Sequence, residues 1–181
     1  MDKRVLWITR TAVFLALLIV AQLVTKPLGQ FVTGSIVNLI LIVSVMTCGL
    51  LSGLAVALIS PILATLFGVG PIWAIVPVMM VGNASLVIIW HLIGNNKVLA
   101  GKDVAGICAL IVAAVIKYAL LFLGVTRVVL PLIGLADSNP AKAALLTTMF
   151  SLPQLATATI GGAFAIAILP ILKKAIRNSG T

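Results

Sequence analysis

Residues 104–124 read VAGICALIVAAVIKYALLFLG, an apolar run in which Lys117 is the one charged side chain. About 20 apolar residues in a helix cross a hydrocarbon core about 30 Å thick. The run is rich in Leu, Ile, Val and Ala and lacks the alternation expected of a barrel strand. This stretch therefore predicts a transmembrane helix that carries a lysine into the membrane.

The rest of the chain has the same character. Of its 181 residues, 62% are hydrophobic and 8% are charged, whereas a soluble domain carries about 25% charged residues. The sequence predicts an all-α integral membrane protein, with residues 1–181 forming a single transmembrane domain. We expect a bundle of six transmembrane helices, at about residues 5–25, 34–50, 53–70, 73–94, 104–124 and 144–172. No small-residue cleavage site and polar mature chain follow the first run, so we expect it to remain as a span.

Glycine, proline and polar residues separate the predicted spans. Residues 26–30 (KPLGQ) end the first run, and residues 49–53 are expected to form a tight turn between the second and third spans. Residues 68–71 (GVGP) separate the third and fourth spans, and residues 94–103 form the clearest polar loop. Residues 126–142 suggest an interfacial excursion before the last span.

The basic residues are divided unequally between the two predicted sides. An even number of spans places both termini on one side, together with Lys3, Arg4, Arg10, Lys97, Lys102, Lys173, Lys174 and Arg177. The other side holds Lys26, Arg127 and Lys142. Because cytoplasmic loops are enriched in Lys and Arg, we expect both termini to be cytoplasmic. The net charge of +9 does not indicate nucleic-acid binding, since no basic face gathers these residues.

The chain has few of the residue types that catalysis requires. It has no glutamate, and Asp2, Asp103 and Asp137 fall in predicted tails or loops, so a carboxylate pair is missing. One histidine, His91, cannot build a His-rich metal site. A Ser–His hydrolase is formally possible, but we expect His91 to lie at the membrane interface beside Trp90. We therefore expect no enzyme, no cofactor and no metal; uphill transport would need a partner, because no span holds a proton-relaying acid.

Four strongly polar side chains fall within spans at similar predicted depths. We estimate the depth of each from its position along its span, with a rise of about 1.5 Å per residue. Four helices then place their polar groups on the outer side of the membrane centre: Asn38, Asn83, Lys117 and Gln154. Each asparagine could instead hydrogen-bond a neighbouring helix, and Lys117 could extend to the outer surface. A buried ammonium needs an anion, a cluster of carbonyl oxygens or the loss of its proton. We expect the four residues to line a ligand site, where a substrate carboxylate or phosphate would pair with Lys117.

Aromatic and small residues complete the candidate sites. Phe31, Trp73 and Tyr118 are predicted near the outer loops, where they could stack on a flat ligand; an aromatic belt is the alternative for Trp73. Ala12 and Ala16 stand four residues apart on the first span. Small residues at that spacing let another helix approach closely, either a partner's helix or one of the same bundle.

These features resemble the substrate-binding S components of energy-coupling factor (ECF) vitamin transporters. The resemblance covers essentially the whole chain, including its size and six predicted spans. It includes a basic N-terminus running into residues 10–16 (RTAVFLA), residues 32–38 (VTGSIVN) and Gly82-Asn83. It implies that the protein captures a small vitamin, vitamin precursor or related micronutrient from the outside of a bacterial cell membrane.

The resemblance also implies partners. An S component docks on a transmembrane coupling protein that bears two cytoplasmic ATPases, and Ala12 and Ala16 match the family's docking face. The family's pocket lies toward the outside; here its few polar groups imply a small, partly apolar ligand, anionic or aromatic in part. The alternative is a self-sufficient carrier or channel, which would need an internal repeat or a continuous polar path. The sequence shows neither, and the missing carboxylates disfavour a membrane enzyme.

Overall fold

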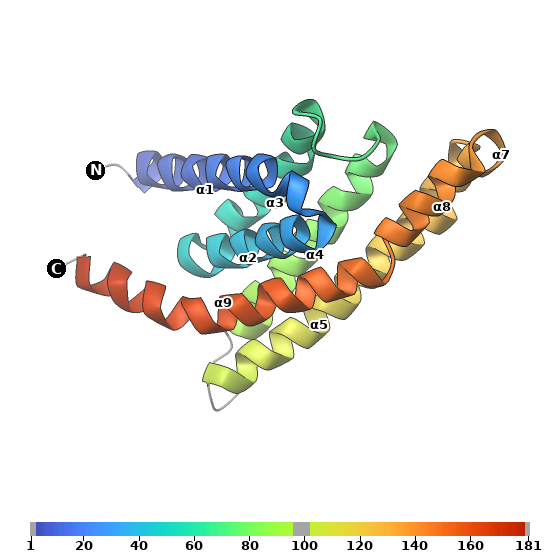
Figure 1. The fold of residues 1–181 in the computed structure, drawn as a ribbon. Coiled ribbons are helices and arrows are strands. Elements are labelled where there is room, and N and C mark those ends of the chain that lie inside the picture. Colours follow the sequence, from blue (N-terminus) through green and yellow to red (C-terminus); the bar gives the residue numbers. More distant parts are fainter. Residues whose placement is uncertain (1–2, 96–101, 180–181) are drawn as a thin grey trace.

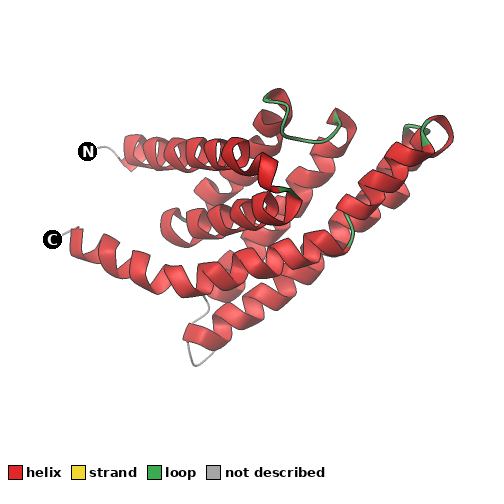
Figure 2. Cartoon of the chain, in the orientation of Figure 1, coloured by secondary structure: helices red, strands yellow, loops and turns green. Residues whose placement is uncertain are grey.

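A computed structural model describes residues 3–95 and 102–179, and every element in these ranges is helical (Figures 1 and 2). The long helices are α1 (Lys3–Thr25), α2 (Gln30–Cys48), α3 (Leu50–Leu66), α4 (Val76–Gly94), α5 (Lys102–Leu123) and α9 (Leu152–Ser179). Shorter elements connect them: η1 (Lys26–Leu28), η2 (Trp73–Ile75), the π-helical η3 (Gly124–Val129), α6 (Leu130–Leu132), α7 (Leu135–Ser138) and α8 (Pro140–Met149). The predicted all-helical class is confirmed.

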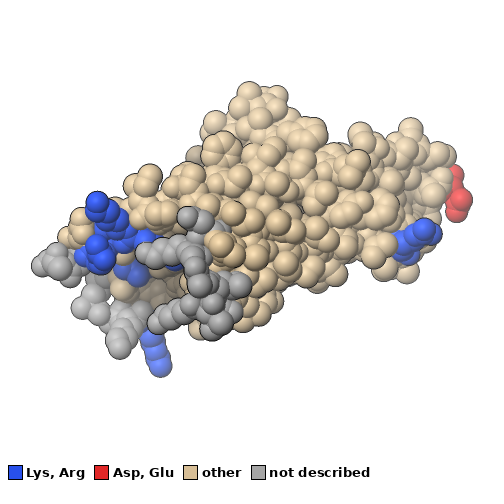
Figure 3. Space-filling model, turned by 90° about the horizontal axis from the view of Figure 1, so that it is seen from below, with Lys and Arg blue, Asp and Glu red and all other residues tan. Residues whose placement is uncertain are grey.

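Most of the long helices could cross a membrane. Five segments are long and apolar enough: Arg4–Leu28, Gln30–Cys48, Trp73–Gly94, Val104–Leu132 and Pro140–Asn178; α3 is apolar but has 17 residues. Large apolar side chains lie exposed on their outer faces, a surface that suits lipid rather than water. The start of α1 and the end of α9 lie at the same end of the elongated bundle (Figure 1). Figure 3 shows Lys and Arg side chains at the two ends of the molecule and none across the middle of that face.

The structure moves two boundaries around α2. The helix begins at Gln30 rather than at residue 34, so Asn38 lies about 12 Å along it and not one turn in. The tight turn predicted for residues 49–53 is reduced to Gly49, whose φ of 89° is a left-handed conformation that glycine adopts without steric cost. Gly53 already lies inside α3.

Within the predicted span 144–172, which lies inside the apolar segment Pro140–Asn178, the helix is interrupted. The first part, α8, ends at Met149, and α9 begins at Leu152 with Pro153 in its first turn. Proline has no backbone N–H to donate, which suits the start of a helix rather than its interior. Residues 126–142 continue α5 through η3 and α6 and turn back into α8, forming a helical hairpin with α7 at its tip (Figure 1). Within the predicted polar loop 94–103, residues 96–101 lie outside the described residues.

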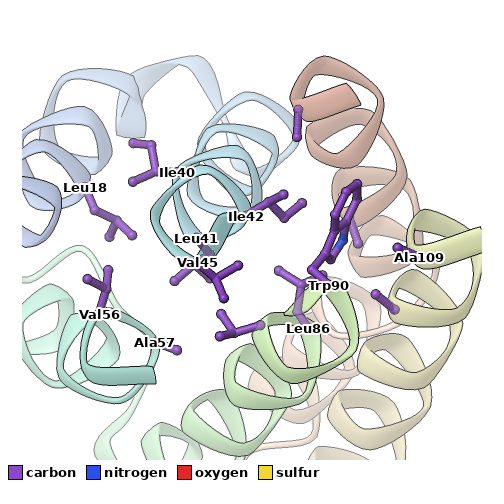
Figure 4. Packing of buried hydrophobic residues seen from close by; sticks show 14 of the residues in the cluster. Leu18, Ile40, Leu41, Ile42, Val45, Val56, Ala57, Leu86, Trp90 and Ala109 are labelled. Carbon is purple, nitrogen blue, oxygen red and sulfur yellow. The ribbon is translucent and has the colours of Figure 1, made fainter. Parts of the chain in front are cut away.

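The main hydrophobic core contains residues from all five helices α1 through α5 and from α9. Figure 4 shows its buried side chains, among them Leu18, Leu41, Val56, Leu86 and Trp90. Trp90 is 1% exposed, so its ring packs inside the bundle. His91, the next residue, is half-buried in the last turn of α4.

The helices α2 and α9 pack closely at Gly161. A Cβ atom added there would lie 2.5 Å from the carbonyl oxygen of Ser35 and 2.8 Å from Cβ of Asn38. Small residues permit such backbone contact between membrane helices. The contact holds Asn38 against α9, so the position of a candidate site residue depends on this glycine.

We predict that Gly161→Ala lowers the thermal stability of the detergent-solubilised protein more than Gly106→Ala does. At Gly106 the nearest atom to an added Cβ is the flexible Ile166 side chain at 3.2 Å, whereas at Gly161 two of the three nearest are backbone atoms. Both substitutions gain the same helix propensity, so the difference between their thermal stabilities reports overpacking at Gly161. Such overpacking costs about 1–3 kcal/mol. Equal midpoints in thermal unfolding would show that α2 and α9 can separate freely.

Candidate ligand-binding site

A cavity of about 340 Å³ lies between α1, α2, α4, α5 and the junction of α8 with α9. It reaches the connections from α1 to α2 and from α3 to α4, which stand at the end of the bundle away from the termini (Figure 1). Its polar lining consists of Gln22, Lys26, Gln30, Thr33, Asn38, Asn83, Lys117 and Gln154. Most of the other lining residues are apolar, and the volume falls within the usual range of small-molecule pockets, about 300–1,000 Å³.

Lys117 lies in the deep part of this cavity, and its side chain is 3% exposed. Its Nζ donates hydrogen bonds to Oδ1 of Asn38 at 2.6 Å and to Oδ1 of Asn83 at 2.7 Å. An ammonium has three N–H donors, so these two bonds leave one donor for another acceptor. Among the described residues that line the cavity, none carries a carboxylate. The polar cluster can therefore stabilise a negative charge that enters from outside the chain.

A chain of hydrogen bonds fixes Asn38 to α9. Its Nδ2 donates to Oγ1 of Thr157 at 3.4 Å, and the Thr157 hydroxyl donates to the carbonyl oxygen of Gln154 at 3.2 Å. Because α8 ends at Met149, the carbonyl oxygen of that residue accepts from Nε2 of Gln154 at 3.2 Å and from Nε2 of Gln30 at 2.5 Å. The carbonyl oxygen at the break between α8 and α9 thus accepts hydrogen bonds from α2 and from α9, through two side chains that line the cavity.

The structure brings together the four predicted polar residues and separates the predicted aromatic ones from them. Asn38, Asn83, Lys117 and Gln154 all line the cavity. Phe31 and Trp73 are 56% and 54% exposed and do not line it. Tyr118 instead stacks on Phe122, with ring centroids 5.8 Å apart. Among the described residues, Phe150 is the one aromatic residue that lines the cavity.

Sequence reasoning missed several polar lining residues of α1 and α2. Oε1 of Gln22 and Oγ1 of Thr33 are buried, and neither has a hydrogen-bond partner in the described part of the chain. A signal was available: Gln22 interrupts the first apolar run. Along α2 the lining positions are 30, 33, 34, 37 and 38, a spacing that marks one helix face once the helix is known to begin at Gln30.

Lys26, an exposed residue of the short η1 element, also lines the cavity. Its Nζ donates to the carbonyl oxygen of Gly68 at 2.6 Å, which joins the end of α1 to the connection between α3 and α4. Lys26 and Lys117 are the two cationic side chains among the described lining residues; Lys117 is buried, whereas Lys26 is exposed.

The alanines of α1 lie on a face that the described residues do not cover. Ala12 and Ala16 are both exposed, while α1 packs against α2 and α3 through other side chains. Buried Thr11, next to Ala12, donates to Oγ of Ser52 at 2.9 Å and so fixes α1 on α3. The exposed alanines leave a shallow surface where a further helix could approach.

Together, the apolar helices and the internal cavity define a membrane protein with a site for a small molecule. The chain belongs to the family described as ECF transporter, substrate-specific component, which matches residues 7–173. The resemblance found in the sequence is confirmed. Members of this family are substrate-binding transport subunits rather than enzymes, and this chain is a multi-pass protein of the cell membrane. No curated protein and no solved structure shows a significant match to it.

We predict that Asn83→Leu destabilises the ligand-free protein by roughly 1.5–3 kcal/mol, because it removes an acceptor from a buried ammonium. In the double variant Asn83→Leu/Lys117→Met no ammonium remains, so the combined loss should fall short of the sum of the single losses by at least about 1 kcal/mol. Thermal unfolding in detergent measures all three variants. Asn95→Leu, at an exposed amide near the end of the same helix, is the control. Additive losses would mean that Lys117 and Asn83 are not coupled.

Proposed function

We propose that this chain is the substrate-capture subunit of an ATP-driven importer for a small vitamin, vitamin precursor or related micronutrient. The substrate enters from the outside and binds in the cavity around Lys117, where Asn38, Asn83 and Gln154 also contact it. The observation that carries the proposal is the buried Lys117, held by two amide oxygens in a cavity whose described lining has no carboxylate. A bound substrate would complete the polar contacts that the chain leaves open.

The proposal requires six crossings with both termini in the cytoplasm. With its 17 residues, α3 is at the short end of the range that spans a bilayer, about 17–25 residues. An even number of crossings is supported by the position of both chain ends at one end of the bundle (Figure 1). The sequence also concentrates its Lys and Arg residues on the terminal side. The cavity then faces the outside, where a scarce nutrient is captured.

Energy for import comes from partners in this proposal. The sequence has no nucleotide-binding P-loop and no acid within a predicted span. The chain would dock through the exposed Ala12 and Ala16 on a transmembrane coupling protein with two cytoplasmic ATPases. The function is tested by purifying the chain from its native membrane and identifying what stays bound. A coupling protein, two ATPases and a retained small molecule are expected, whereas a chain that transports without them would be a self-sufficient carrier.

The chain alone, in sealed vesicles, should bind the retained compound without accumulating it. No group in the predicted spans can couple transport to an ion gradient, so an imposed proton or sodium gradient should leave the internal concentration at equilibrium. Uptake of the radiolabelled compound measures this, and vesicles that contain the complete complex with internal or external ATP are the control. Robust uphill uptake by the lone chain would contradict the proposal.

Ala12→Trp and Ala16→Trp should each abolish assembly with the coupling protein while the isolated chain still binds its substrate. A bulky ring on this face prevents close helix approach. Co-purification measures assembly, and equilibrium binding to the isolated chain measures retention of the site. Ala163→Trp, at an exposed position of α9, is the matched control. If both α1 variants assemble normally, the docking face lies elsewhere.

A further inference from the structure

We infer that the cavity selects one chemical class of substrate: a monocarboxylate with an aliphatic body and a neutral N–H or O–H donor at its other end. This inference rests on the proposed function and narrows it. Three features of the cavity support it, one for each part of such a molecule: the single deep ammonium, the apolar middle and the unpartnered oxygens of Gln22 and Thr33.

The deep end fits one negative charge. Lys117 is the one cation there, and two of its three N–H groups already bind Asn38 and Asn83. The other lining cation, Lys26, binds the carbonyl oxygen of Gly68. A phosphate monoester carries about −1.5 to −2 charge and offers three strong acceptor oxygens, and the described lining residues include no arginine to pair with it. A carboxylate matches the single remaining donor and the single charge.

The middle of the cavity fits an aliphatic body. Apolar side chains that line the cavity include Val37, Met79, Leu121, Leu146 and Met149. Met79 and Leu121 lie four residues, about 6 Å, outward of Asn83 and Lys117. Methionine side chains adapt to irregular and flexible apolar shapes. The cavity cannot hold a flat heterocycle between two aromatic rings, because Phe150 is the one aromatic residue among the described lining residues.

The outer part of the cavity fits a neutral donor. Gln22 is 7% exposed, and its Oε1, like Oγ1 of Thr33, is buried without a partner in the described residues. The amide oxygen of Gln22 can only accept, and a buried acceptor left unpaired costs free energy, so a ligand N–H or O–H that reaches it contributes to binding. The Thr33 hydroxyl can accept from the same ligand group. Thr33 and Asn38 share one face of α2 and are separated by about 7–8 Å along the axis. Thr33 therefore lies outward of the contact between Asn38 and Lys117, toward the connection from α1 to α2.

The test is to expose the full-length immobilised chain, in detergent, to a small-molecule extract of cells and to identify the compounds it enriches. Carbodiimide coupling to an amine counts their carboxyl groups by mass, and transfer into D₂O counts the other exchangeable hydrogens. We expect enriched compounds with one carboxyl group, no phosphorus and at least one further exchangeable hydrogen. This measurement uses the wild-type chain alone, so it does not depend on the folding of any variant.

Three variants then locate the recognition. For the enriched compound, Lys117→Met should raise the dissociation constant at least about a hundredfold, because the carboxylate loses its buried partner. Gln22→Leu should raise it roughly tenfold. Lys142→Met is the matched control for loss of a lysine, since Lys142 is exposed on α8 and does not line the cavity, and it should bind as the wild type does.

The outcomes separate the inference from the proposed function. An enriched compound that is neutral, cationic, phosphorylated or a plain fatty acid would leave the capture function standing and overturn the inference. A monocarboxylate that Lys117→Met binds with unchanged affinity would overturn it as well. If the wild-type chain enriches no compound at all, the proposed function fails and the inference fails with it.

Discussion

The arrangement of the bundle depends on the contact between the Lys117 ammonium and two asparagine side chains. A lysine in the middle of a membrane helix is costly unless it faces the bundle interior and finds partners there. Its partners come from two other helices, because Asn38 belongs to α2 and Asn83 to α4. Three helices must therefore meet at one depth and at hydrogen-bond distance. The same contact creates the chemistry of the site, since neutral amide oxygens orient the ammonium without cancelling its charge.

Backbone features elsewhere make this contact possible. Gly161 lets α9 lie directly against α2, and Thr157 on α9 accepts a hydrogen bond from the Asn38 side chain. The break between α8 and α9 exposes the Met149 carbonyl oxygen, which binds the side chains of Gln30 and Gln154. Even a continuous helix through residues 150–151 would leave that carbonyl without its usual donor, because the residue four positions on is Pro153, which has no N–H. The irregular backbone at one end of the bundle thus supplies polar contacts around a cavity that is otherwise apolar.

Depth along the helices was a good guide to the polar part of the site and a poor one to the aromatic part. Asn38, Asn83, Lys117 and Gln154 were placed at one level by counting residues, and all four line the cavity. The same count cannot tell which way a side chain points around its helix. Tyr118 neighbours Lys117 in the chain, but successive residues on a helix point about 100° apart, and its ring stacks on Phe122. Gln22 and Thr33 were overlooked because a single amide or hydroxyl is a weak signal within an apolar run.

The sequence by itself determined that the chain is helical and lies in a membrane, because composition and the length of apolar runs set those properties without reference to any contact. It also determined the family, since the match extends over residues 7–173. The tertiary structure decided which polar groups meet. Hydrogen-bond distance, the glycine contact between α2 and α9 and the break after Met149 depend on helix rotation and packing. These are properties of residues far apart in the chain, and no local pattern specifies them.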